Sequence, residues 1–385
     1  MLNSITKLAN SKDNNFVFLH AILRSNYKKR YICPDMTTTP HRERIHYLDA
    51  AKGILILLLL LHHFQSATRD FTMLNTYFEL FTSWHSVFTV FFMQCFFIIS
   101  GYCTGFGARP GTFFYKILRQ LLIPWIVFEV LTALFWAFYH SDFSFGRFAS
   151  FFFTEPCTAL WFLNALIFSK AVVYLLKKLV RKEGFILLIT FLLLVGSIAL
   201  NEYDIGPNYL AVRQSLGACF FVALGSYLRT VPRLYDGLLK VGFFAFILLY
   251  AATQFLGTRV PYSTASIFVT LRTFPLFFFL STTGSFALLQ LCRWIKRCSV
   301  LEYFGRNTLV IYGLHYCPLY AFIVWFNTLL VPVNTFRFVL FILAVYGSEL
   351  LVCVLLITLF RTKFLRWCIS DSPKLLRLCG MNSDS

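Results

Sequence analysis

Charged residues are scarce in this sequence, and acidic residues are the scarcest of them. Only 14% of the 385 residues are charged, and 17 acidic residues stand against 35 lysines and arginines. Soluble domains contain about 25% charged residues, so the chain does not have the composition of one. Hydrophobic residues make up 58% of it, and apolar runs long enough to cross a bilayer recur along its length. We therefore predict an all-α, polytopic membrane protein built as one helical bundle.

The cysteines lack the spacing of a metal site or a disulfide framework. The 11 cysteines are scattered, no C-x-x-C occurs, and Cys157 alone is expected to lie clearly outside the membrane. We therefore expect neither disulfides nor a bound metal. Internal repeats are also missing, which weakens the interpretation as a transporter built from inverted repeats.

The formal net charge of +18 would suit a nucleic-acid partner, but the placement of the basic residues argues against one. They lie in short clusters between apolar runs, and 28 of the 35 fall in segments that share one side of the membrane if the N-terminus is inside. This asymmetry follows the positive-inside rule, predicts that both termini are cytoplasmic, and requires an even number of spans. Membrane lipids are expected as partners and nucleic acid is not.

We predict about ten transmembrane helices of roughly 20 residues each. They are placed at residues 50–66, 84–104, 121–139, 159–176, 184–200, 210–228, 239–256, 265–289, 307–326 and 337–359. The membrane domain covers residues 47–360, between a basic cytoplasmic arm over residues 1–46 and a basic tail over residues 361–385. The arm is expected to be disordered or to come from an upstream start, because Met36 begins a compact lead-in to the first span.

The first span carries a polar stripe. Lys52 and His63 are eleven residues apart, within roughly 20° of three full turns and about 16 Å apart along a helix. Asp49 lies three residues before Lys52 and joins the same stripe. A charge facing lipid costs about 2.5–3.5 kcal/mol, so the stripe is expected to face protein or water, with Asp49 and Lys52 paired. The simpler alternative is that Lys52 anchors the helix by reaching the headgroups.

The histidines are the residues best suited to proton transfer. An imidazole has a pKa near 6.5, so it can accept and return a proton at neutral pH. His63 is favoured because it shares the stripe, although a membrane histidine such as His85 is as often a hydrogen-bonded core residue. His315 lies eight residues past Asn307, about 12 Å deeper by helical rise, and can therefore approach His63 at the same depth from another helix.

Two more motifs occupy the ends of predicted spans. The pair Ser100-Gly101 interrupts a Phe-rich span, and its small residues favour close helix packing. Lys116 and Arg119 lie three residues apart on one predicted helix face, which suits phosphate recognition as well as simple anchoring. Pro124 follows them and is expected to kink the helix.

Three polar residues remain within or beside predicted spans. Trp161 is typical of an interfacial anchor, and Asn164, one turn further in, needs a polar partner. Arg272 falls inside the predicted eighth span, where it is expected to line a cavity or to pair with Glu349.

Taken together, five motifs resemble those of the integral-membrane acyltransferase family 3, especially its fucose 4-O-acetylase-like branch. The resemblance covers the chain from residue 48 to residue 315. The motifs are Leu48-Asp49 with Lys52-Gly53-Ile54 and His63, then Ser100-Gly101, then Lys116 and Arg119 before Pro124, then Trp161-Phe162-Leu163, and Gly305-Arg306-Asn307-Thr308-Leu309 with His315. The chain departs from the branch in its doublet His62-His63, which keeps His62 as an alternative to His63, and in the lysine at position 52, where arginine is commoner.

The resemblance implies an enzyme that transfers an acyl group, usually acetyl from acetyl-CoA, to a hydroxyl of a surface glycan or a lipid-linked sugar. Acetyl-CoA is then a donor substrate, no cofactor is bound, and the location is the bacterial cytoplasmic membrane. His63, Asp49, Lys52 and His315 are expected to be catalytic, Lys116 and Arg119 to hold the CoA phosphates, and Ser100, Trp161, Asn164, Arg272 and Asn307 to contact substrate. The alternatives are a transporter of a glycan or small solute and, more weakly, a non-catalytic assembly partner.

Overall fold

Long apolar segments become helices in this chain because a helix satisfies every backbone hydrogen bond within itself, as hydrocarbon requires. The computed structural model describes residues 45–68, 85–140, 146, 160–206, 208–258, 260, 269–330, 334–362, 365, 368 and 369, and shows no strand among them. All of these belong to a unit that spans residues 45–376. Nearly all of the predicted basic arm, most of the tail and nearly all of the loop over residues 140–158 lie outside the described residues.

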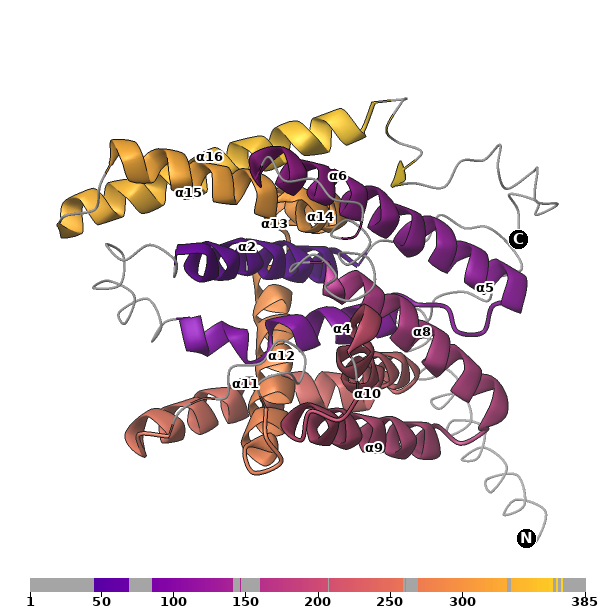
Figure 1. Ribbon diagram of the computed structural model, residues 1–385. Helices are drawn as coiled ribbons and strands as arrows, with labels where there is room; N and C mark the ends of the chain where they lie inside the picture. The colour runs from indigo at the N-terminus through magenta and orange to yellow at the C-terminus, as the bar shows by residue number, and fades with distance from the viewer. Residues whose placement is uncertain are drawn as a thin grey trace, which may run out of the picture. The chain divides into compact units, whose positions relative to one another are not determined.

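The helices follow one another in the order shown in Figure 1. They are α2 (His46–Thr68), α4 (Phe92–Cys103), α5 (Pro110–Ile117), the π-helix η2 (Leu118–Leu122), α6 (Ile123–His140), α8 (Trp161–Leu179), α9 (Glu183–Glu202), the 3₁₀ helix η3 (Tyr209–Ala211), α10 (Val212–Thr230), α11 (Pro232–Phe255), α12 (Phe274–Ile295), α13 (Ser299–Arg306), α14 (Thr308–Leu314), α15 (Tyr316–Leu329) and α16 (Thr335–Phe360). Residues 85–89 add a short helical segment before α4.

Within the described part of the chain, eight helices are long and apolar enough to cross a membrane. A ninth span arises if α14 and α15, which meet at an angle of 52°, count as one bent helix. The remaining predicted span corresponds to α8, which is as long but carries three lysines. The chain is thus an all-helical integral membrane protein with eight to nine candidate spans, and the count of ten and the cytoplasmic termini stay predictions.

The two largest errors in the predicted starts of spans both lie near a proline. The third was expected at 121–139, but the candidate span runs from Pro110 to Tyr139. Pro124 does not break it, because the preceding turn widens into η2, which accommodates the missing backbone N–H and the bulk of the ring. The eighth was expected at 265–289, but α12 begins at Phe274, with Pro275 in its first turn where proline is favoured.

The late start of α12 corrects the predicted environment of Arg272. This residue lies in the turn before the helix and is exposed, so it is not inside a span. The predicted pairing with Glu349 is also wrong. Glu349 is buried in α16, and neither of its carboxyl oxygens has a hydrogen-bond partner among the described residues.

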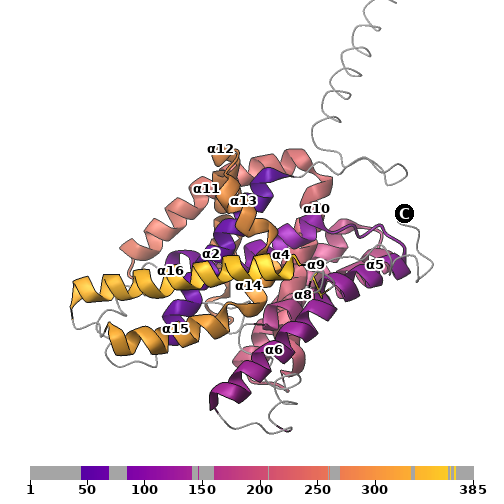
Figure 2. The ribbon, with the colours of Figure 1, turned by 90° about the horizontal axis from the view of Figure 1, so that it is seen from above.

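Helix α2 lies at the centre of the packing. It contacts α4, α12, α13, α14 and α15. Figure 1 shows it between α4 on one side and α15 with α16 on the other, and Figure 2 shows α16 alongside α15. Its buried apolar residues include Leu55, Ile56 and Leu59, which join the main core. Polar side chains on the faces of α2 that pack against these helices are therefore surrounded by protein.

Glycines allow the closest helix approach. A Cβ on Gly101 would overlap the Val222 carbonyl, and a Cβ on Gly225 would overlap the Ile98 carbonyl, so α4 and α10 cross backbone to backbone. The structure thus confirms the packing interpretation of Gly101. The carbonyl of the neighbouring Ser100 accepts a hydrogen bond from the Thr104 hydroxyl at 2.7 Å.

Candidate active site

The first and last motifs meet where α2 crosses α13. A Cβ on Gly53 would overlap the Leu301 carbonyl, and one on Gly305 would overlap the Asp49 carbonyl and approach the Gly53 nitrogen at 3.0 Å. No side chain larger than hydrogen fits at either position without moving backbone. The two motifs therefore share a structural reason for their glycines, which is to bring Asp49 and its neighbours against α13.

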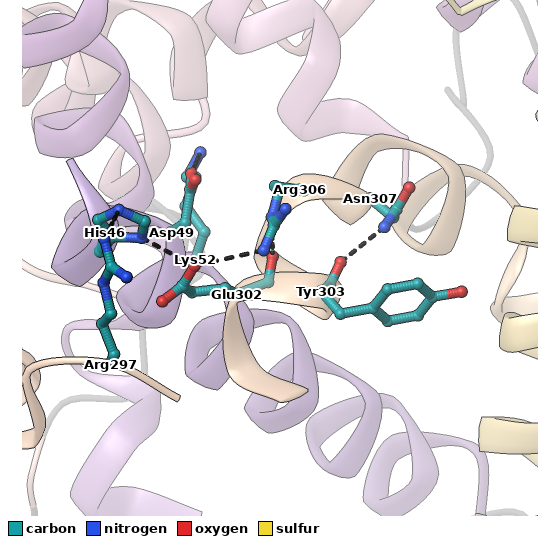
Figure 3. A network of polar contacts seen from close by, with 8 residues as sticks. All are labelled: His46, Asp49, Lys52, Arg297, Glu302, Tyr303, Arg306 and Asn307. Atoms are coloured by element: carbon teal, nitrogen blue, oxygen red, sulfur yellow. Dashed lines mark hydrogen bonds and ion pairs between the residues drawn. The ribbon is translucent and has the colours of Figure 1, made fainter. Parts of the chain in front are cut away.

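A polar network surrounds this crossing (Figure 3). Glu302, almost fully buried, lies 2.9 Å from His46 Nδ1 and 3.3 Å from an Arg306 guanidinium nitrogen. The other ring nitrogen of His46 is 2.9 Å from Arg297. We call His46, Arg297, Glu302 and Arg306 the Glu302 network. Beside it, Lys52 Nζ is 2.6 Å from an Asp49 carboxylate oxygen, as the spacing of three residues predicts.

Asn307 belongs to this end of α2. Its amide nitrogen donates to the Tyr303 carbonyl at 2.6 Å, and its amide oxygen accepts from Arg361 at 3.3 Å. Both ends of the amide are therefore occupied. These bonds hold Asn307 at the Asp49 end of α2, and the expected contact between Asn307 and substrate stays a prediction.

Four histidines meet further along α2. His62 and His63 come from α2, His85 from the helical segment before α4, and His315 from the break between α14 and α15. His62 Nδ1 and His85 Nε2 are 2.7 Å apart, so one nitrogen donates to the other, and their rings stack with centroids 4.9 Å apart. The ring centroids of His63 and His315 are 5.0 Å apart, as the predicted depth of His315 requires. We call these four residues the histidine cluster.

The hydrogen bonds of His315 fix its tautomer. Its Nδ1 lies 3.1 Å from the Ile311 carbonyl and 3.0 Å from the Tyr312 carbonyl. Carbonyl oxygens only accept, so Nδ1 carries the proton and Nε2 presents a lone pair. His315 is fully buried, and Nε2 has no hydrogen-bond partner among the described residues. A buried acceptor without a partner is costly, which makes it a candidate contact for a substrate proton.

The start of α8 reaches the same region. The backbone N–H of Phe162 donates to the Tyr312 hydroxyl at 3.2 Å, and the Phe162 ring packs against Phe97 at 4.7 Å between centroids. The half-buried Trp161 precedes it. Asn164 is buried, and its amide nitrogen has no partner in the described part of the chain. Within the described part of the chain, the partner predicted for Asn164 is therefore missing at its amide nitrogen.

The basic pair before Pro124 does not share one environment. Lys116, in the last turn of α5, is exposed, whereas Arg119 in η2 is buried, with 3% of its surface accessible. The π-turn intervenes between them and alters the predicted helix face. Arg119 acts electrostatically on Cys368, beyond the end of α16. Burial raises the pKa of the Cys368 thiol, and Arg119 opposes this rise.

Two features of the site were missed by reasoning from the sequence. The pairing of His62 with His85 joins residues on different helices, and only the doublet His62-His63 hinted at it. Glu302 was not singled out, although a lone acid among basic residues in a short segment is a usable signal for a buried counter-ion. Among the described residues, no group of three or more His, Cys, Asp or Glu side chains is arranged to hold a metal ion.

Apolar helices of membrane-spanning length, with four imidazoles gathered among them, define a helical-bundle membrane protein. Residues 45–358 match a family described as an acyltransferase domain, acyltransferase family 3. Because this match covers most of the chain, the chain belongs to that family and is a membrane acyltransferase. No curated protein and no solved structure matches the chain. The family match does not favour the transporter alternative.

Proposed function

We propose that this acyltransferase moves an acyl group, acetyl in the simplest case, from acyl-CoA to a hydroxyl of a cell-surface glycan or a lipid-linked sugar. This activity corresponds to the fucose 4-O-acetylase-like branch of the family. The observation that supports it best is the contact of His63 with His315, whose unpartnered Nε2 faces no protein donor among the described residues. Transfer to a hydroxyl needs a neutral imidazole at the reacting atoms, and the histidine cluster supplies it.

In the proposed reaction His63 is the general base. The acceptor oxygen attacks the thioester carbonyl while its proton moves to His63, so that the new C–O bond forms and the O–H bond breaks. The C–S bond then breaks, and the proton on His63 passes to the departing CoA thiolate. His315 Nε2, an acceptor held by the Ile311 and Tyr312 carbonyls, stabilises the imidazolium that forms on His63. Atoms and protons balance without any further reagent.

The donor is proposed to enter at the end of α2 that carries Asp49 and Lys52. In the sequence this end is next to the basic N-terminal segment, so the positive-inside rule predicts that it is the cytoplasmic one. Arg119, with Lys116 at the rim, is proposed to hold the CoA phosphates. The thioester would then reach the histidine cluster through the bundle. Ser100, Trp161 and Asn164 are proposed substrate contacts, and Arg272 one at the exposed rim.

The test is to supply acetyl-CoA labelled in its acetyl group to membranes that contain the protein. The proposal predicts label in base-labile esters of a glycan or lipid-linked sugar, and none in membranes that lack the protein. A His63→Ala variant present in equal amount should transfer no label above that background. Full transfer by this variant would contradict the assignment of His63.

The same experiment tests the transporter alternative, and its repetition with the purified protein tests the assembly-partner alternative. A transporter would give no ester under any donor concentration, because it moves its solute unchanged. A non-catalytic assembly partner would support labelling in cells and none with the purified protein. For the proposed location, bacterial cytoplasmic membranes separated from other membranes should carry the activity.

A further inference from the structure

The three lysines of α8 differ in what surrounds them. Lys177 Nζ pairs with both carboxylate oxygens of Glu183, at 2.7 and 2.9 Å. Lys178 is exposed and lies over the Tyr174 ring, 5.4 Å from its centroid. Lys170 is half-buried and forms no hydrogen bond or ion pair with any residue that the structure describes. It is therefore a cation inside the helical part of the protein whose counter-ion is not supplied by the described chain.

Lys170 lies on the face of α8 that is packed against protein. The residues one turn away on that face are Leu166, Val173 and Tyr174, and all three are buried. A lysine on the lipid-facing side can extend to the headgroups, but a lysine on this face points its chain among neighbouring helices. The ionisable group that acts on it is the Cys103 thiol, in the last turn of α4.

The helix pair α8 and α5–η2 brings Lys170 to the depth of Arg119. The two segments lie side by side (Figure 1), with η2 against α8 and the Phe113 ring stacked on Tyr174 at 4.0 Å. They run in opposite directions, because Lys177, later in α8, lies over the ring of Phe106, which precedes α5. Lys170 lies four residues before Tyr174, about 6 Å by helical rise. In the antiparallel segment, the same distance from Phe113 leads to Ile117, which lies between Lys116 and Arg119.

Helix α8 occupies one of the predicted spans, and a charge at the centre of a span costs about 2.5–3.5 kcal/mol, so a cation at this place is suited to an anion from outside the protein. We propose that Lys170 binds the phosphate groups of the acyl-CoA donor, together with Arg119 from the facing helix. This inference rests on the proposed function, because it assigns the donor to acyl-CoA. The location of Lys170 agrees with that role. Cys103 acts electrostatically on Lys170 and also on Tyr47, which lies at the start of α2, about 24 Å by helical rise from His63.

The experiment compares two donors in direct binding to the purified full-length protein. Acetyl-CoA carries the phosphates, and S-acetyl-pantetheine has the same thioester arm without them. In Lys170→Met, the dissociation constant for acetyl-CoA should rise roughly tenfold or more, as for a lost hydrogen bond to a charged group, while that for S-acetyl-pantetheine stays unchanged. Lys170→Arg should keep most of the acetyl-CoA affinity, and Lys178→Met is the matched control that should bind both as the wild type does.

Two outcomes would overturn the inference. If Lys170→Met weakens the binding of both donors equally, Lys170 has a structural role. If it binds acetyl-CoA with wild-type affinity, Lys170 has no role in binding the phosphates. If Lys170→Met does not fold, Lys170→Gln replaces it under the same criteria. Loss of the proposed function looks different: a Lys170-dependent preference for acetyl-CoA with no ester formed in membranes would retain the phosphate site and reject the O-acyltransfer to a sugar.

Discussion

The two ends of α2 hold polar groups in opposite ways. At the Asp49 end, the carboxylates of Asp49 and Glu302 have basic partners within 3.3 Å, and the crossing is closed by Gly53 and Gly305. At the other end, four imidazoles meet, and His315 keeps a buried lone pair that no described residue satisfies. Both carboxylates at the Asp49 end have their partners, whereas at the histidine end His315 Nε2 has none among the described residues.

This difference separates groups that stabilise the fold from groups kept for a reaction. Buried polar atoms are normally satisfied, since each unsatisfied one costs about 1–3 kcal/mol. The Glu302 network obeys this rule, which is typical of structural packing. His315 Nε2 departs from it, and departures of this kind concentrate at functional sites. The comparison therefore predicts that variants at the Asp49 end lower stability and that variants at the histidine end lower activity.

The largest effect is expected from His315→Gln. Glutamine keeps a polar side chain of similar size but does not provide a basic imidazole nitrogen, so the rate of acyl transfer should fall by about 10²- to 10⁴-fold. The melting temperature in detergent should change little. His46→Gln is the matched control at the other end of α2, where it should lower stability and leave the rate per folded molecule near that of the wild type. Equal rates for the two variants would remove the distinction between the ends.

Gly305→Ala should produce the next largest effect, on stability. The added methyl group meets the Asp49 carbonyl and the Gly53 nitrogen, which are backbone and cannot rotate away. Overpacking of this kind costs about 1–3 kcal/mol. Gly347→Ala is the control, because that glycine is exposed in α16 with no atom near its added Cβ. Thermal unfolding in detergent measures both, and a loss in the control as large as that in Gly305→Ala would contradict the close crossing.

Much of the fold could be predicted because lipid leaves the backbone few choices. Apolar length alone indicated helices at each predicted span, and the family match then confirmed an acyltransferase. The errors lie at the ends, where polar residues near an interface lower the apolar signal. The candidate span from Pro110 was shortened in the prediction because Lys116 and Arg119 lie within it.

The site could be predicted along one helix but not between helices. A spacing of eleven residues places Lys52 and His63 on one stripe, and the depth of His315 followed from its distance from Asn307. The pairing of His62 with His85 depends on how two helices rotate against each other, which hydropathy does not encode. For the same reason the contact of Asn307 with Arg361, at the end of α16, could not be derived from the spacing along its own helix.

Glu302→Gln is expected to have a smaller effect than Gly305→Ala. Glutamine keeps the shape and one acceptor, but it loses the charge that faces His46 and Arg306, so we expect a loss of about 1 kcal/mol. Glu183→Gln is the control, because the Glu183 side chain is 36% exposed against 8% for Glu302, and the pair of a more exposed carboxylate is worth less. Urea or thermal titration in detergent compares the two. A larger loss in the control would show that burial does not set the value of these pairs.

The smallest effect is expected for the pair of Asp49 and Lys52. Their side chains are 13% and 27% exposed, so a double-mutant cycle of Asp49→Asn and Lys52→Met should give a coupling in stability of about 0.2–1 kcal/mol. If the pair only orients the start of α2, the activity per folded molecule should stay near that of the wild type. A fall in rate of more than tenfold in either variant, with stability retained, would instead mean that these charges act on the donor. The Asp49 end would then be functional as well, and the contrast between the two ends of α2 would hold for Glu302 and its partners alone.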